Sequence, residues 1–580
     1  MHKDIAKLKE NFFSFNIPLI LLIIVSLFFL FINLIWSQCN FSFGYWCQGN
    51  ENFMGVVQLN TFFKKLFISS QLKEIIWGQY GHANSYPSLY FIWQAMVSHV
   101  ANTLNYATLI FGNYLLFLLT TIFIYKIAIT IKDRKTGLVS VLLFSIYPGV
   151  YGSSRFCMVE NALIPIVTIA IYFLIKSQNF LNIRYCILLG LSLGLGLLTK
   201  QHFILFVVGG ICYEFFLAIF NRRINVEPEN YKKFLNIIII LILSILISLP
   251  FYLRVFKYQM HLFYEYKYQY FLATGPEYVK SGALVSWLYY LFILINAQLS
   301  LPLFIIFLVS FSWIIVFTKK NRVLPHLMIW ILFPYFILQM FNVKWNKYSL
   351  PYLPACALIS GLAISQIKVK RYLINSLVVI IFIFGIAQNV FFSFFDIHQS
   401  PLIKNRFLKA PYNRDTDWNI YFFVHANAVV KPDYIRRINC QRLIATIDNY
   451  LSNKGKADIW FFTKVKEAAN NENADLSSYL ELHCLLKGYG FSKYNFKEDD
   501  EIHTILNSRH NDSSVVILKL PDGFVFTEEQ TNHFLKYIIQ NDKGGLSLVA
   551  KKLIFNLNFQ ENYCINPGIY YLVVFKQDNL

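Results

Sequence analysis

Aspartate is scarce in the first two thirds of this 580-residue chain. Only two aspartates occur before residue 396, Asp4 and Asp133, and each lies beside lysine or arginine. The whole chain has 32 acidic residues against 52 lysines and arginines, and charged residues of both signs make up only 14%. Any carboxylate that serves chemistry in the first 395 residues, away from those basic segments, must therefore be one of a few glutamates.

Common metal and nucleotide motifs are also missing. The sequence has no Cys-x-x-Cys or His-Glu-x-x-His element, which argues against a structural zinc site or a zinc protease. It has no glycine-rich phosphate loop, so it predicts no bound nucleotide. The net charge of +20 is spread along the chain rather than gathered on one soluble face, so we expect no nucleic-acid partner.

Long apolar runs are abundant. Hydrophobic residues make up 56% of the chain and aromatic residues 18%. A run of about 20 apolar residues matches the thickness of a bilayer core, and the first run lacks the cleavage site of a signal peptide. We predict eleven spans, at about 17–36, 106–131, 137–153, 159–176, 182–199, 202–220, 234–252, 300–318, 323–342, 348–366 and 371–393.

Two shorter apolar segments, at about 87–102 and 284–298, are rich in Tyr and Trp. Such segments are typical of helices that lie at the membrane interface. Counting them as spans would place the basic loop at Lys132 outside, against the rule that basic loops stay in the cytoplasm. We therefore predict interfacial helices there.

Every second connection between the predicted spans is basic, which places the N-terminus in the cytoplasm. With eleven spans, the chain beyond residue 395 then lies outside. That part is richer in Asp, Asn, Glu and Lys, has short strand-like runs, and is long enough for a core of its own. The predicted fold is an all-α polytopic membrane domain, residues 1–395, followed by a smaller extracytoplasmic α/β domain, residues 396–580. We expect an integral protein of a bacterial inner membrane.

The outer segments hold the candidate functional residues. Glu51 is the first acid on the outer side, although a lone loop acid is more often solvated. Glu160 opens an apolar span, where a carboxylate is costly unless it is paired. It either forms an interfacial salt bridge with Arg155 or serves function, and Lys200 could share its site. Lys200 itself could instead be a snorkelling interfacial lysine.

A divalent metal ion is a minor alternative for the outer loops. Glu74, His82 and His261 could hold one only if their loops converge. Each histidine is by itself more typical of a hydrogen-bonded structural residue. Apart from this possible metal ion, the sequence indicates no cofactor.

Five motifs follow one another on the predicted outer side, and together they resemble a known family. They are Asn50-Glu51, Pro87-Ser88-Leu89-Tyr90, Ser154-Arg155 with Glu160, Leu198-Thr199-Lys200, and Lys344 with Lys347-Tyr348-Ser349-Leu350-Pro351. This order is similar to that of the C-type, polyprenyl-phosphate-sugar-dependent membrane glycosyltransferases, such as protein O-mannosyltransferases and the lipid A aminoarabinose transferase. The resemblance covers residues 10–395.

The resemblance implies roles for these residues. Glu51 would be the catalytic base, and Glu160 would support the base or the acceptor site. The family's usual aspartate is replaced by Asn50, so either Glu51 has taken its task or the chain is inactive. The implied phosphate-binding residues are Lys200, Arg254, Lys267 and Lys347, and the remaining pocket residues are Asn50, His82, Arg155, His261 and Tyr348.

The implied reaction moves a sugar from a polyprenyl phosphate to an extracytoplasmic lipid, glycan or protein. A carboxylate would take the acceptor's proton, cations would stabilise the leaving phosphate, and direct displacement would invert the anomeric carbon. One alternative is a lipid-linked sugar flippase or transporter, which is disfavoured because the two halves lack matching broken helices. Another is a surface-polysaccharide polymerase or ligase, which would use the same lipid-linked donors.

Overall fold

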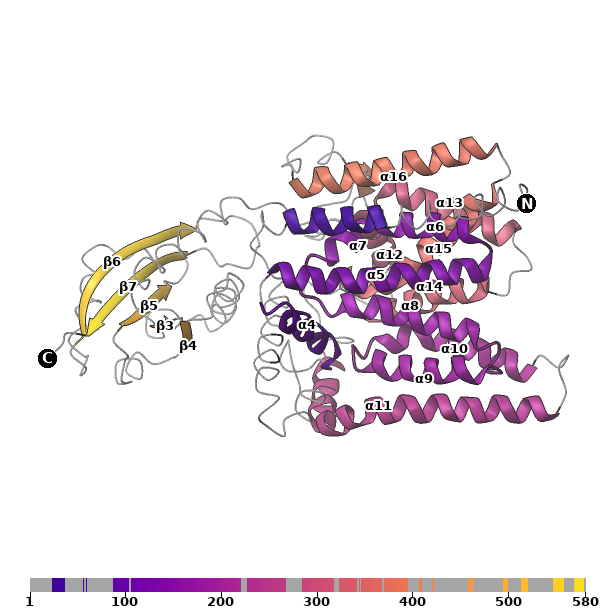
Figure 1. The fold of residues 1–580 in the computed structure, drawn as a ribbon, viewed down its shortest axis with the longest axis horizontal. Helices are drawn as coiled ribbons and strands as arrows, with labels where there is room; N and C mark the ends of the chain where they lie inside the picture. Colours follow the sequence, from indigo (N-terminus) through magenta and orange to yellow (C-terminus); the bar gives the residue numbers. More distant parts are fainter. Residues whose placement is uncertain are drawn as a thin grey trace, which may run out of the picture.

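The computed structural model describes a helical region followed by strands (Figure 1). The described residues of the helical region are 23–36, 56, 59, 87–103, 106–220, 227–267, 284–317, 323–341, 344, 346–367 and 370–394. Beyond these, the structure describes seven strands between residues 406 and 577.

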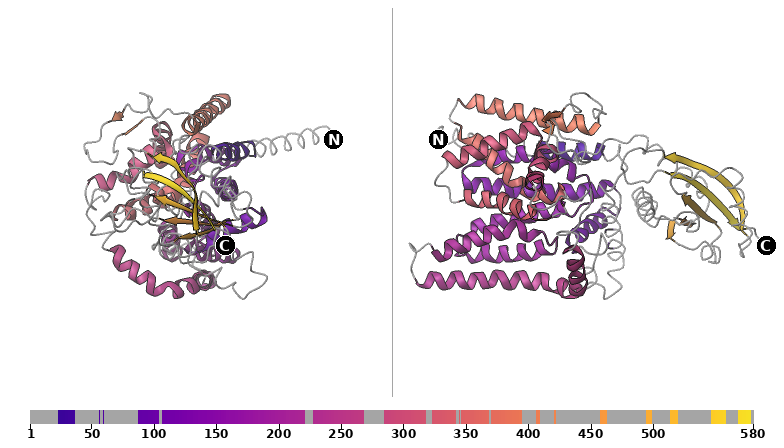
Figure 2. Two further views of the ribbon diagram at one scale, coloured as in Figure 1. Left: turned by 90° about the vertical axis from the view of Figure 1, so that its left-hand side faces the viewer. Right: turned by 180° about the vertical axis from the view of Figure 1, so that it is seen from behind.

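The helices form one bundle in which most axes run in roughly the same direction (Figures 1 and 2). An N-terminal helix covers Ile23–Trp36. The others are α4 (Leu89–Val100), α5 (Tyr106–Ile131), α6 (Arg134–Ile146), α7 (Pro148–Ser153), α8 (Glu160–Lys176), α9 (Ile183–Leu197), α10 (Phe203–Phe220), α11 (Glu227–Lys267), α12 (Leu284–Ile293), η4 (Leu294–Leu299), α13 (Leu301–Phe317), α14 (Leu324–Gln339), η5 (Asn346–Tyr352), α15 (Leu353–Gln366) and α16 (Arg371–Phe394).

Each predicted span overlaps one or two of these helical segments. Within the described residues, four stretches are long and apolar enough to cross a membrane: Ala107–Ile131, Tyr231–Phe256, Asn346–Gln366 and Tyr372–Phe391. A fifth candidate is the pair formed by Trp287–Leu299 and Leu301–Phe317, which is bent by 119°. The remaining apolar helices are shorter, so the count of eleven crossings stays a prediction.

Two helices differ from the predicted ranges. The segment predicted at 137–153 is broken at Tyr147, whose backbone is extended (φ −69°, ψ 124°), because Pro148 begins a separate short helix and lacks the N–H that a continuous helix needs. The span predicted at 234–252 lies within a longer helix, α11, which begins at Glu227 and continues through Pro250 to Lys267. The last part of α11 turns across the end of the bundle (Figures 1 and 2).

The two segments predicted as interfacial helices, about 87–102 and 284–298, contain short helices in the structure. α4 covers the first, and α12 with the π-helix η4 covers the second. The sharp bend between η4 and α13 falls at Ser300, whose φ of 73° is unusual for a residue with a side chain.

Small residues let some helices approach closely. On α15, a Cβ added at Gly361 would lie 2.9 Å from the backbone nitrogen of Ser140 on α6. On α9, Gly190 lies in the same way against the backbone of Ile240 on α11. Close approach at small residues is typical of packing between membrane helices.

Five of the C-terminal strands form one mixed sheet with the order β4-β3-β5-β7-β6, and β1 and β2 form a separate antiparallel pair. β3 is parallel to β4 and β5, whereas β7 is antiparallel to β5 and β6. Parallel pairs need a crossover connection. The connecting segments lie outside the described residues, so the α/β domain stays a prediction. The strands are β1 (Arg406–Leu408), β2 (Ile420–Tyr421), β3 (Ala457–Phe462), β4 (Tyr494–Glu498), β5 (Ser513–Lys519), β6 (Leu546–Leu557) and β7 (Gly568–Gln577).

The five-stranded sheet lies beyond the end of the bundle at which α4 and α7 are found (Figures 1 and 2). The candidate site described next is built at that same end, from the start of α8 and from the corner between α9 and α10.

Candidate functional site

A buried ion pair joins two of the predicted site residues. Glu160 is the first residue of α8, and Lys200 lies in the corner between α9 and α10. The Lys200 Nζ lies 2.5 Å from Glu160 Oε1, and both side chains are almost fully buried. Burying either charge alone would be costly, so each makes the other tolerable at this depth.

His202, Lys347 and Tyr348 lie beside this pair. We call the five residues Glu160, Lys200, His202, Lys347 and Tyr348 the charged cluster. The Lys200 ammonium lies 5.1 Å from the centroid of the Tyr348 ring, and the His202 ring stacks on that ring with the two centroids 4.8 Å apart. Lys347 is buried and lies close enough to act electrostatically on Glu160 and His202. Two lysines against one carboxylate leave the cluster with an excess positive charge when His202 is neutral.

His202 is neutral at ordinary pH. Burial, together with the nearby Lys200 and Lys347 cations, lowers the pKa of His202 to about 3, although Glu160 acts in the opposite direction. The histidine therefore adds an aromatic surface rather than a third positive charge.

Backbone contacts bring two of the motifs together at this corner. The Leu89 N–H, at the start of α4, donates to the Leu198 carbonyl at 3.1 Å. From α11, the Tyr252 hydroxyl donates to the Leu197 carbonyl at 3.0 Å, and Phe251 packs against Leu198. Hence the Pro-Ser-Leu-Tyr motif, the Leu-Thr-Lys motif and the part of α11 around Phe251 meet beside Lys200.

Two asparagines fix the turn that leads into Glu160. The side-chain amide of Asn113, on α5, donates to the Ser154 and Phe156 carbonyls at 2.9 Å each. The Asn161 amide donates to Phe156 O at 2.8 Å, and Gln94 of α4 in turn donates to Asn113 Oδ1 at 2.6 Å. Because buried carbonyls need partners, these amides hold the turn and set where α8 begins.

Arg155 does not pair with Glu160, so the salt bridge considered from the sequence is not present. Its Nε donates to Asn33 Oδ1 at 2.9 Å, and its Nη2 donates to Asn389 Oδ1 at 2.9 Å and Ser393 Oγ at 2.6 Å. The guanidinium also lies 4.9 Å from the Trp36 ring centroid. Arg155 thus joins the N-terminal helix, the turn before α8 and the end of α16.

Lys344, a cation on the predicted outer side, has a structural partner. Its Nζ donates to the Leu338 and Gln339 carbonyls at 3.1 and 3.0 Å, at the C-terminal end of α14. A cation there donates hydrogen bonds to carbonyls that have no partner within the helix, and it interacts favourably with the negative end of the helix dipole. Burial lowers the pKa of Lys344 to about 8. The helix end accounts for this cation without an anionic ligand.

The other predicted site residues lie on α11 or outside the described part of the chain. The Arg254 side chain is exposed on α11. His261 and Lys267 belong to the helical backbone of α11, but the placement of their side chains lies outside what the structure describes. The residues wholly outside the described part of the chain are Asn50, Glu51, Glu74 and His82.

A metal site is likewise untested. Among the described residues, no group of three or more His, Cys, Asp or Glu side chains could hold a metal ion. The sequence-based candidates, Glu74, His82 and His261, all have side chains outside that set.

Sequence reasoning missed two neutral residues beside the cluster. The Gln298 amide, on η4, donates to Asn346 O at 2.8 Å and to Ser349 Oγ at 2.6 Å. The Trp330 indole N–H, on α14, donates to Pro351 O at 3.0 Å. For Gln298, the only sequence signal was a polar residue within the largely apolar segment 284–298.

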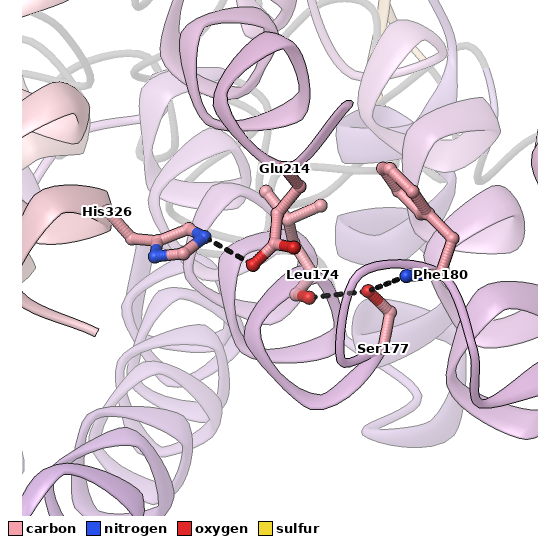
Figure 3. Close-up of polar contacts among 5 residues, drawn as sticks. All are labelled: Leu174, Ser177, Phe180, Glu214 and His326. Atoms are coloured by element: carbon pink, nitrogen blue, oxygen red, sulfur yellow. Dashed lines mark hydrogen bonds and ion pairs between the residues drawn. The ribbon is translucent and has the colours of Figure 1, made fainter. Parts of the chain in front are cut away.

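A second buried polar pair lies elsewhere in the bundle. His326 Nε2, on α14, lies 2.8 Å from Glu214 Oε1, on α10, and both side chains are almost fully buried (Figure 3). Glu214 is about 16 Å along α10 from its first residue, at 1.5 Å per residue. The nearby Ser177 hydroxyl donates to Leu174 O at 2.7 Å (Figure 3). This pair is therefore separate from the charged cluster.

Comparison with known proteins identifies the class of fold. A family described as dolichyl-phosphate-mannose-protein mannosyltransferase matches residues 86–248, a range that contains Glu160 and Lys200. No curated protein sequence matches the chain significantly.

The chain is also similar to solved structures of ArnT from Cupriavidus metallidurans. The apo crystal structure has a TM-score of 0.53 at 10% identity, and the structure bound to undecaprenyl phosphate has a TM-score of 0.51 at 12% identity. Each comparison covers 96% of this chain and 97% of that chain. The similarity shows a shared fold. Together with the family match, it confirms the predicted resemblance to the C-type membrane glycosyltransferases, and with the apolar helices it indicates an integral membrane protein.

Proposed function

We propose that this chain is a membrane glycosyltransferase that moves a sugar from a polyprenyl-phosphate donor to an extracytoplasmic acceptor. The observation that carries the proposal is the charged cluster, in which Lys200 and Lys347 face a single buried carboxylate, Glu160. The ArnT fold supports it, since one of the two similar ArnT structures holds undecaprenyl phosphate.

Lys200 and Lys347 would bind the lipid phosphate. Charge develops on that phosphate as the sugar leaves, and fixed cations in a site of low dielectric stabilise it strongly. Tyr348 and the neutral His202 would line the same place without adding charge. We further propose that Arg254 and Lys267 contribute from the outer end of α11, as predicted from the sequence.

Glu160 would hold Lys200 rather than accept a proton. Its carboxylate is already bonded to the Lys200 ammonium at 2.5 Å, which favours its charged form and makes it a poor base. The proposed base is Glu51. It would take the proton of the acceptor hydroxyl or amine while the acceptor attacks the anomeric carbon.

In this step the bond between the anomeric carbon and the phosphate oxygen breaks, and polyprenyl phosphate leaves with the electron pair. A single direct displacement inverts the anomeric centre. If a divalent metal ion takes part, Glu74, His82 and His261 would be its ligands.

The orientation follows from the basic loops. We propose that the N-terminus is cytoplasmic, that the charged cluster lies at the extracytoplasmic surface of a bacterial inner membrane, and that residues 396–580 form an extracytoplasmic α/β domain. The strands lie beyond the same end of the bundle as the cluster, which supports placing both on one side (Figure 1).

Binding of undecaprenyl phosphate to the purified chain in lipid nanodiscs tests the proposal. Lys347→Met and the charge-balanced double variant Lys200→Met/Glu160→Gln should each weaken binding at least tenfold. The matched control is Lys132→Met, because Lys132 donates to the Ser365 carbonyl at 2.7 Å, far from the cluster. Unchanged affinity in both cluster variants would contradict the proposal.

Glu51→Gln, compared with the unsubstituted chain, separates a transferase from a flippase or transporter. A transferase should keep its affinity for the lipid donor and lose transfer to the acceptor, measured with a labelled lipid-linked sugar. A flippase would move that sugar across the bilayer and transfer none of it, in the unsubstituted chain as well as in the variant.

A further inference from the structure

We propose that Gln298 is a positioning residue, which holds Lys347 and Tyr348 at the charged cluster by clamping the short helix η5. This inference rests on the proposed function, because it assigns Gln298 a part in binding the lipid phosphate. Gln298 carries no charge, and its side-chain amide donates to Asn346 and Ser349, so it would act through η5 itself.

The two hydrogen bonds of the Gln298 amide lie on either side of the residues that it would position. Its Nε2 donates to Asn346 O at 2.8 Å, before Lys347, and to Ser349 Oγ at 2.6 Å, after Tyr348. The Ser349 hydroxyl also donates to Asn346 O, at 3.1 Å. The Lys347-Tyr348 pair is therefore enclosed between two anchors on one side chain.

A second anchor follows directly. The Trp330 indole N–H donates to Pro351 O at 3.0 Å, and Trp330 is only 1% exposed. η5 is a 3₁₀-helix, a form with poorer hydrogen-bond geometry that is used in short pieces, so its own hydrogen bonds hold it weakly. Fixation from outside, by α14 and η4, is what gives Lys347 a defined place.

The backbone around Gln298 is unusual in a way that suits this task. Gln298 lies in the π-helix η4, and Ser300 has a φ of 73°. On α7, a Cβ added at Gly149 would lie 3.1 Å from the Gln298 Cα, so α7 packs tightly behind it. π-helical turns and positive φ angles are costly, and they occur often at functional sites. Here they direct the Gln298 amide toward η5.

Loss of the amide would free η5 without removing any charge from the cluster. A misplacement of about 1 Å in a positioned group can cost up to about a hundredfold in rate. Lys347 would no longer be held beside Glu160, and the lipid phosphate would meet a less ordered cation. The expected result is weaker binding of the donor, seen mainly in KM.

The test uses Gln298→Met, which keeps a similar side-chain volume and removes both hydrogen bonds. The matched control is Asn236→Leu on α11, because the Asn236 amide is buried and donates to Phe180 O at 2.7 Å. Both variants lose a buried amide-to-carbonyl bond, so a similar drop in thermal midpoint is expected. Only Gln298→Met should weaken undecaprenyl phosphate binding and raise KM for the lipid-linked donor, by about tenfold. Equal affinities in the two variants would overturn the inference.

A second measurement does not depend on the proposed function. Acetylation of Lys347 by a lysine reagent, followed by mass spectrometry, reports how firmly η5 is held. Gln298→Met should accelerate acetylation of Lys347 at least threefold while leaving Lys132 unchanged. If the unsubstituted chain binds no polyprenyl phosphate, the proposed function fails, but the acetylation rate still tests whether Gln298 holds η5. An unchanged rate at Lys347 in Gln298→Met would overturn that role of Gln298.

Discussion

The charge balance of the cluster depends on single residues, and neutralising one partner differs from neutralising both. Lys200→Met removes the ammonium that is bonded to Glu160, whereas Lys200→Met/Glu160→Gln removes both members of the pair and leaves the net charge of the cluster unchanged. Breaking a buried pair by removing one partner typically costs about 3–5 kcal/mol, and removing both costs far less. We expect the single variant to have the lower thermal midpoint in detergent. Equal midpoints would show that the pair is not held in a buried site.

His202 gives a pH prediction. Its pKa is about 3 in the folded chain, against about 6.5 for an unperturbed histidine. Between these values the unfolded chain binds the proton more strongly, so His202 lowers stability as the pH falls through this window. His202→Gln should remove that part of the loss.

The measurement is the thermal midpoint at pH 7 and pH 5. The difference between the two should be smaller in His202→Gln than in the unsubstituted chain, and the transfer rate should keep the same pH dependence above pH 7. An unchanged difference in midpoint would mean that His202 is already charged in the folded chain at pH 5.

At the residue scale, the sequence predicted where charge is needed but not how each charge is satisfied. The scarcity of acids singled out Glu160, and its place beside a polar corner suggested Lys200 as a neighbour. The sequence could not place Arg155, whose partners on α16 lie 234 and 238 residues away. Nor could it show that carbonyls of α14 hold Lys344, because helix-end contacts depend on where the helix stops.

At the scale of the elements, hydropathy located almost every helix, because a bilayer core demands apolar runs of a fixed length. Breaks within helices were harder to predict. The end of α6 before Pro148 has a local cause, but the π-helix η4 and the bend at Ser300 depend on packing against α7 and η5. The sequence did not predict the proposed role of Gln298 for that reason, because this role depends on a bend that has no sequence signal.

Two helical glycines give a prediction about element packing. A Cβ at Gly361 of α15 would lie 2.9 and 3.0 Å from the Ser140 backbone of α6, which cannot move without shifting α6. Gly361→Ala should destabilise the chain by about 1–3 kcal/mol. In the control, Gly210→Ala of α10, the Cβ meets side-chain ends rather than backbone, namely Leu174 Cδ2 at 3.0 Å and Ile171 Cδ1 at 3.7 Å.

Because alanine favours helices over glycine by about 0.5–1 kcal/mol, Gly210→Ala should be neutral or slightly stabilising. Thermal unfolding of both variants in one detergent measures the contrast. Equal destabilisation would mean that α6 and α15 do not pack as closely as the structure indicates.

For the whole molecule, the decisive question is which end of the bundle faces out. α5 has 26 residues, so it is about 39 Å long at 1.5 Å per residue and is long enough to cross a bilayer. Val100, 85% exposed, lies just before α5, and Arg134, also exposed, lies just after it. If the basic loops are cytoplasmic, the two residues lie on opposite sides of the membrane.

Single cysteines at these positions test the orientation. Val100→Cys should react with a membrane-impermeant maleimide in intact spheroplasts, and Arg134→Cys should react only in inside-out vesicles. The unsubstituted chain supplies the background from its native cysteines. The reverse pattern would place the start of α8, and with it Glu160 and Lys200, at the cytoplasmic surface. Transfer to an extracytoplasmic acceptor would then be impossible, whatever the affinity of the cluster for phosphate.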